Sequence, residues 1–222
     1  MGKTVTAYLI GAGESAGKHE EKWGFLREHS IKASGKDPLT GLHRTGLDKY
    51  LEVIFPDTTD WIYDKAFGIH GNENYRIRPD YRSDSLNLIV EFDGLPHYTD
   101  PAVIIKDDNN TAIYIKNGYK VVRIPYFIQL TNDAVEKLFG VKVKEPLFNV
   151  SYPSLGGVEM KHNPSCLCPE GVKRMAKEFK NFTEQYEINI QSLRAMNNDM
   201  LSGVNLKSAY SIFFLFFFPK SS

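Results

Sequence analysis

"RPDYRSDSLNLIVEFDGLPH", residues 78–97, contains a largely apolar run at residues 86–90 that is typical of a buried β-strand. Two carboxylates, Glu91 and Asp93, follow this run directly. An acidic group at the end of a buried strand is unfavourable unless something pairs with it. Because the two residues are two positions apart, both side chains point to the same face of a strand. The stretch therefore predicts that a positively charged or hydrogen-bonding partner lies beside Glu91 and Asp93 at one end of a sheet.

A third carboxylate, Asp80, comes shortly before this strand. It follows Pro79, whose fixed φ extends the chain and whose missing N–H suits the start of a strand. A turn around residues 83–85 then brings Glu91 onto the adjacent strand, and His97 follows on a proline-ordered turn. Carboxylates and a histidine on neighbouring strand ends form an oxygen-rich site of the kind that binds Mg²⁺ or Mn²⁺. The expected metal ligands are Asp80, Asp93 and Glu91.

Helices and strands alternate around this stretch. An amphipathic helix is expected from residue 45 to residue 55, and a second helix between Asp100 and Gly118. The other expected elements are strands at residues 61–67, 75–81, 86–92 and 119–127, a turn at residues 93–97, and a capped helix at residues 131–139. This order predicts an α/β fold in which helices flank a mixed sheet.

The pattern divides the chain into three parts. Residues 1–44 predict a short strand, a Gly-rich turn and a polar loop, and residues 45–140 form the expected core. Residues 141–222 form an extension whose main feature is one long amphipathic helix at residues 169–193. The apolar run at residues 212–218 is far shorter than the roughly 20 residues of a membrane-spanning helix. We expect it to be a buried strand or a cap packed on another surface, in preference to a lipid anchor.

Composition excludes several classes of protein. The chain has 222 residues, and its 27 basic and 27 acidic residues give a net charge of zero, which argues against a wholly basic nucleic-acid binder. The acids are nevertheless concentrated at residues 79–108, where seven acidic residues against two basic ones give a net charge of minus five. An acidic centre with basic flanks is typical of a metal-dependent enzyme that acts on a polyanion.

The two cysteines and the N-terminal residues bear on location. Cys166 and Cys168 are too close in sequence to staple the fold, so we expect a reducing compartment, the cytoplasm. Together with His162 they supply three soft ligands where zinc needs four, which favours ordinary thiols. The first residues contain an apolar run too short for a secretory signal, so we expect no leader and no membrane contact.

A phosphate-binding loop is suggested by "GAGESAGKH", residues 11–19, but its spacing is wrong. Such a loop needs four residues between its first glycine and the Gly-Lys pair, and a Ser or Thr after the lysine. Here Gly11 leaves five residues, Gly13 leaves three, and His19 follows the lysine. ATP or GTP chemistry is therefore the weakest of the functional hypotheses.

The core resembles the PD-(D/E)xK nuclease superfamily over about residues 45–130, on "RPDYRSDSLNLIVEFDGLPHY", an Asp-bearing helix and "NGYKVVRIPYF". The pattern is nearest to the branch with very-short-patch repair endonucleases, EDxHD homing endonucleases and DUF559-type domains. The matching positions are Asp48 or Glu52, Asp80, Glu91, Asp93, Gly94, His97, Asp107 or Asp108, and Arg123. The resemblance implies a restriction-endonuclease-like core and Mg²⁺-dependent hydrolysis of DNA. Its implied catalytic residues are Asp80, Glu91, Asp93, His97, Asp108 and Asp48.

Two departures from that pattern change the expected roles. The position of the superfamily's signature lysine is occupied by Asp93, so His97 becomes the leading candidate for general base or leaving-group acid. The arginine common three residues after the helix aspartate is also missing. Asp48 has a purely local alternative, because it lies three residues after Thr45 in the manner of a capping box.

The expected partner is double-stranded DNA, with a homodimer built on residues 169–193 as one assembly. The candidate DNA-binding residues are Arg78, Arg82, Lys120 and Arg123 in the core, and Lys32, Lys36 and Arg44 in the loop before it. Each of the core residues could equally be an ordinary strand-edge charge. A sequence-specific enzyme of the restriction or homing type is the favoured function. The alternatives are a non-catalytic DNA-binding module of the same fold and a mismatch or repair nicking endonuclease.

Overall fold

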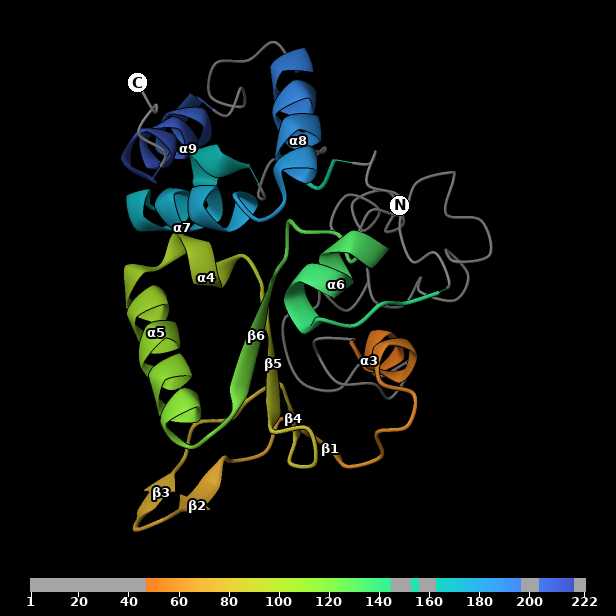
Figure 1. Ribbon diagram of the computed structural model, residues 1–222. Coiled ribbons are helices and arrows are strands. Elements are labelled where there is room, and N and C mark those ends of the chain that lie inside the picture. The colour runs from red at the N-terminus through yellow and green to blue at the C-terminus, as the bar shows by residue number, and fades with distance from the viewer. Residues whose placement is uncertain (1–46, 145–152, 156–162, 197–203, 218–222) are drawn as a thin grey trace, which may run out of the picture.

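The computed structural model describes residues 47–144, 153–155, 163–196 and 204–217 (Figure 1). The expected strand, Gly-rich turn and polar loop before residue 45, with Lys32, Lys36 and Arg44, lie outside the described residues. The described elements form a mixed α/β fold, as the sequence predicts.

A four-stranded mixed sheet forms the centre, in the order β1-β4-β5-β6. Its strands are β1 (Trp61–Tyr63), β4 (Tyr81–Ser83), β5 (Leu88–Asp93) and β6 (Lys120–Pro125). β1, β4 and β5 run antiparallel in succession, and β6 runs parallel to β5. In the β4–β5 register Tyr81 pairs with Val90, so Asp80 lies beside Glu91. The adjacency of these two acids follows directly from the pairing.

The parallel pair β5–β6 needs a crossover, which α4 (Pro96–Thr99) and α5 (Pro101–Lys116) provide. Asp100 caps α5 by accepting a hydrogen bond from the Ala102 amide at 2.8 Å, and Gly118 follows the helix with φ of +87°. The expected turn at residues 93–97 is wrong in part, because residues from Pro96 onward form the single helical turn α4. A proline at the first helical position favours that outcome.

Two helices cover the face of the sheet opposite α5, α3 (Asp48–Ile54) and α6 (Asn132–Phe139) (Figure 1). Both were expected from the sequence. Thr131 caps α6 by accepting from the Ala134 amide at 3.1 Å, and Gly140 ends the helix with φ of +76°. The apolar face of α3 is buried, which fixes this layer against the sheet.

A small hairpin of β2 (Gly68–His70) and β3 (Glu73–Tyr75) lies at the far end of the sheet from α7 (Figure 1). It corrects two expected strands: the strand at residues 61–67 ends at Tyr63, and the strand at residues 75–81 is interrupted between Tyr75 and Tyr81. The turn consists of Gly71, with φ of +61°, and Asn72. Gly-Asn between two short strands is a hairpin signal that the polar surroundings obscure.

The described part of the C-terminal extension contains η2 (Pro164–Cys166), α7 (Pro169–Phe179), α8 (Thr183–Ala195) and α9 (Val204–Phe217). The expected single helix at residues 169–193 is wrong, because Phe182 leaves the helical region at φ −135° and ψ 55°. Phe182 is itself buried, so the bend keeps the apolar spacing while the direction of the helix changes. Of the two alternatives for residues 212–218, the strand is wrong, since α9 continues to Phe217.

One hydrophobic cluster joins the core and the extension. It includes Tyr50 and Phe127 from the first and Phe179 and Leu193 from the second, and the rings of Phe127 and Phe179 lie 4.7 Å apart. The extension therefore packs as part of the same interior. In the part of the chain that the structure describes, every helix is too short or too polar to cross a bilayer.

Candidate active site

Asp80 and Glu91 lie side by side where β4 and β5 pair. The Asp80 amide donates a hydrogen bond to Glu91 Oε2 at 3.1 Å, and the Phe92 amide donates to Asp80 Oδ2 at 2.9 Å. Both side chains are buried, at 6% and 8% exposure. The two expected metal ligands on adjacent strands are thus fixed by the backbone of the strands that carry them.

Burial and the neighbouring Asp80 carboxylate raise the pKa of Glu91 to about 8, while the charge of Arg123 opposes the shift. The cause is electrostatic, because two carboxylates in a dry site disfavour a second negative charge. At neutral pH and without a cation, the pair therefore retains a proton. A divalent cation beside the pair would favour the ionised form of both carboxylates.

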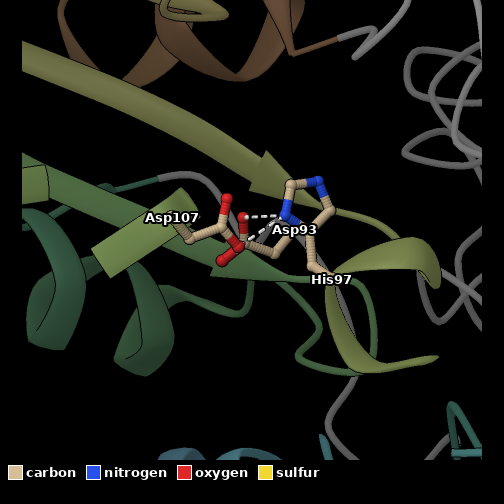
Figure 2. A group of neighbouring side chains, drawn as sticks. All are labelled: Asp93, His97 and Asp107. Atoms are coloured by element: carbon tan, nitrogen blue, oxygen red, sulfur yellow. Dashed lines mark hydrogen bonds and ion pairs between the residues drawn. The ribbon is translucent and has the colours of Figure 1, made fainter. Parts of the chain in front are cut away.

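Asp93, His97 and Asp107 form a second group at the end of β5 and on the crossover helices (Figure 2). His97 Nδ1 lies 2.7 Å from Asp107 Oδ2 and 3.4 Å from Asp93 Oδ1. A carboxylate only accepts hydrogen bonds, so Nδ1 is the donor, and in the neutral imidazole Nε2 then carries the lone pair. The His97 side chain is 27% exposed, which makes it the candidate for proton transfer with a substrate.

Two arginines hold the carboxylates of this second group. Arg123 Nε and Nη2 donate to the two oxygens of Asp93 at 2.8 and 2.5 Å, and Nη2 lies 3.0 Å from Asp107 Oδ1. Arg174 Nη2 lies 2.5 Å from Asp93 Oδ2, and its Nη1 lies 2.7 Å from Asp107 Oδ2. The result is a closed ring of alternating charges that we call the acid–arginine ring: Asp93, Arg123, Asp107 and Arg174.

Asp107, and not Asp108, is the helix aspartate that reaches this site. Asp107 is buried at 5% exposure, whereas Asp108 is exposed on the outer side of α5. Burial of Asp107 opposes its ionisation, but the hydrogen bond from His97 and the charges of Arg123 and Arg174 outweigh burial and lower its pKa. The alternative that the sequence leaves open between the two residues is resolved by position.

Replacing Asp107 should therefore affect stability far more than replacing its neighbour. Asp107→Asn removes one of two carboxylates that neutralise two half-buried guanidinium groups, and we expect it to lower the free energy of unfolding by about 3 kcal/mol. Asp108→Asn, the matched control, should change it by less than about 0.5 kcal/mol. Urea denaturation at pH 7 measures both. Equal effects of the two substitutions would contradict this placement.

The expected DNA-binding residues divide between surface and interior. Arg78, at 57% exposure, pairs with Asp64 at 3.2 Å, and exposed Lys120 donates to the Phe139 carbonyl. Arg82 is nearly buried, with its guanidinium on the Phe67 carbonyl and on Asp84, and Arg123 belongs to the acid–arginine ring. Arg78 and Lys120 thus remain at the surface, while the Arg82 and Arg123 side chains are largely buried.

Helix α3 carries the two remaining candidate acids, Asp48 and Glu52. Asp48 is the first residue of α3, and its side chain lies outside what the structure describes. Glu52 is exposed one turn later. Leu47 precedes the helix without a side-chain cap, so the helix begins later than the expected capping box at Thr45 and Asp48.

Arg174 is the site residue that sequence reasoning missed. It borders the apolar side of α7, next to buried Met175, and its side chain is only 13% exposed. An arginine beside the core face of an amphipathic helix needs an acidic partner. That requirement is the signal, although the sequence does not say which acid supplies it.

Comparison with known proteins identifies no similar protein. The chain matches no protein-family model, no curated protein and no solved structure. A proposal for its function therefore depends on the geometry and chemistry of this site.

Proposed function

We propose that this protein is a Mg²⁺-dependent DNA endonuclease of the PD-(D/E)xK class with a restriction-endonuclease-like core. The observation that carries the proposal is the buried pair of Asp80 and Glu91 where β4 and β5 pair, with Asp93 two residues further along β5 in contact with His97. The order of the matching features also supports it: an acid-bearing helix α3, the strands β4 and β5, the helix α5 with Asp107, and β6. Hard oxygen ligands and a proton acceptor at the same end of β5 suit metal-assisted hydrolysis of a phosphodiester.

Of the two acidic groups, the Asp80–Glu91 pair fits a divalent cation better. Asp93, His97 and Asp107 have ligand atoms within 4.8 Å of one another and could by distance hold an ion. Their carboxylates, however, already bind the guanidinium groups of the acid–arginine ring, which would repel a cation. In the Asp80–Glu91 pair the Asp80 carboxylate raises the pKa of Glu91, so added positive charge beside Glu91 is favourable. We therefore assign Mg²⁺, or Mn²⁺, to Asp80 and Glu91, and Asp93 to the ring.

When bound, the cation would polarise the scissile phosphate and neutralise the charge that develops on it. The chain's own residues perform the proton transfer. His97 Nε2 accepts the proton of the attacking water, while Nδ1–H keeps its hydrogen bond to Asp107. The negative charge of Asp107 stabilises the imidazolium that forms. Asp93 stands at the position of the superfamily's signature lysine, but its carboxylate binds Arg123 and Arg174. His97 is therefore the base.

The acidic site and a basic periphery suit a nucleic-acid backbone. Arg78 and Lys120 at the surface are the described candidates for phosphate contacts. Their effect should be independent of sequence and should weaken as salt increases. Sequence recognition, restriction or homing type, and a homodimeric assembly remain parts of the same proposal.

Incubation of supercoiled plasmid with the protein tests the function. We expect nicked or linear DNA in the presence of Mg²⁺ or Mn²⁺ and intact plasmid in EDTA, with cleavage restored when excess Mg²⁺ is added back. Retarded migration without cleavage in either cation would contradict the enzyme and favour the non-catalytic DNA-binding module. Nicked circles without linear product would favour a nicking endonuclease.

A further inference from the structure

Helix α7 of the extension packs so closely against α4 of the core that no side chain fits between them at Gly171. A Cβ at Gly171 would lie 1.8 Å from the Tyr98 carbonyl oxygen, so only glycine permits this approach. The Cys168 amide donates to the same carbonyl at 3.1 Å, and Tyr98 donates to Glu178 at 2.6 Å. Figure 1 shows α7 directly over α4. The docking fixes the position of every side chain on this face of α7, including Arg174.

From this position Arg174 contacts five groups of the site and its surroundings. Besides Asp93 and Asp107, its Nη1 lies 3.4 Å from the His97 carbonyl oxygen, and its Nε lies 3.1 Å from Glu178. Its guanidinium carbon lies 5.1 Å from the centre of the Tyr98 ring. A planar guanidinium with five donors can satisfy such a set at once, and a lysine cannot.

One oxygen links Arg174 to the histidine. Asp107 Oδ2 accepts from Arg174 Nη1 and from His97 Nδ1, both at 2.7 Å. Arg123 contacts the other oxygen of Asp107 at 3.0 Å. The two arginines thus hold the two ends of this carboxylate. Without Arg174 the carboxylate could rotate about its bond, and His97 would lose the fixed acceptor for its Nδ1 proton.

The charge balance of the acid–arginine ring also indicates that Arg174 keeps His97 in position. Asp93 and Asp107 carry two negative charges, and Arg123 and Arg174 balance them. Removing Arg174 leaves one uncompensated negative charge among buried groups, which favours rearrangement of the ring. The imidazole is the most exposed member of the site and would move first.

We propose that Arg174 is a positioning residue supplied to the active site by the C-terminal extension, and that it holds Asp107 so that His97 keeps its proton on Nδ1 and presents Nε2. Its effect on cleavage rests on the proposed function, whereas its effect on the histidine does not. A purely structural role, in which Arg174 only anchors α7, makes a different prediction for the imidazole. The tautomer of His97 therefore decides between them.

Long-range ¹H–¹⁵N spectra of the labelled protein report the tautomer, with the His97 signals assigned by their loss in His97→Gln. In the unaltered chain we expect the Nδ1–H form. Arg174→Met should give a mixture of tautomers in a protein whose backbone amide spectrum stays folded, and Lys173→Met, on the exposed side of the same helix, should leave the Nδ1–H form unchanged. Should Arg174→Met unfold the protein, Arg174→Lys serves instead. A folded Arg174 variant that retains the Nδ1–H form would overturn the proposal.

Single-turnover cleavage supplies the second measurement. Arg174→Met should lower the rate at saturating DNA by about 10- to 100-fold with little change in the DNA concentration at half-maximal rate, because a positioning group acts on chemistry and not on binding. Arg174→Lys should recover only part of the rate. Loss of binding with an unchanged saturating rate would count against positioning. If the unaltered protein does not cleave DNA, the proposed function fails, and the tautomer experiment still tests Arg174.

Discussion

Asp80→Asn is expected to lower the Mg²⁺-dependent cleavage rate by on the order of 1,000-fold, because several kcal/mol of metal-derived charge stabilisation would be lost. The substitution is nearly isosteric, and the amide oxygen of asparagine can still accept the hydrogen bond that the Phe92 amide gives to Asp80. What it removes is the negative charge beside Glu91. The loss should therefore be one of catalysis, with the fold retained.

The matched control is Asp57→Asn, which changes the same charge at an exposed position just beyond α3. It should cleave at the rate of the unaltered protein. Plasmid cleavage in Mg²⁺, together with DNA binding in Ca²⁺, separates catalysis from affinity for both variants. If Asp80→Asn cleaved at the rate of the Asp57→Asn control, the assignment of the cation to the Asp80–Glu91 pair would be wrong.

Local sequence carries much of this site. The apolar run before Glu91 predicts β5. A short turn after Ser83 joins β4 to β5, so the adjacency of Asp80 and Glu91 needs no long-range information. His97 and Asp107 are separated by one helical turn and the start of α5, and that crossover alone brings them within hydrogen-bond distance. These parts could be predicted because few chain segments intervene.

The sequence does not predict the β5–β6 register or the packing of α7 over α4. The sequence leaves Arg123 open between DNA binding and a strand-edge charge. In the structure β6 pairs with β5 so that Arg123 lies opposite Glu91, and its side chain reaches Asp93 on the same face. Arg174 lies on a helix more remote still, and its contact with Asp93 depends on how α7 packs over α4. Periodicity identifies an amphipathic helix but not the surface that it covers.

Glu91 gives the clearest test that does not depend on DNA. Its pKa is about 8 in the fold against an ordinary value of 4.5, so between these values the folded chain holds a proton that the unfolded chain releases. Raising the pH then favours the unfolded state, and stability is greatest below the unfolded pKa and is lost as the pH rises through about 8. From about pH 5.5 to 8 we expect the free energy of unfolding to fall by on the order of 3 kcal/mol relative to Glu91→Gln.

Mg²⁺ should reverse this loss, because it replaces the proton as the positive charge beside Asp80 and Glu91. Urea denaturation of both proteins, with and without Mg²⁺, should show stabilisation by the cation that grows from pH 5.5 to 8 in the unaltered chain and is absent in Glu91→Gln. Burial also raises the pKa of Glu178, to about 7, but this group is common to both proteins and cancels in the comparison. Parallel pH curves for the two proteins would show that Glu91 does not hold the excess proton, and the cation would then have to be sought elsewhere in the site.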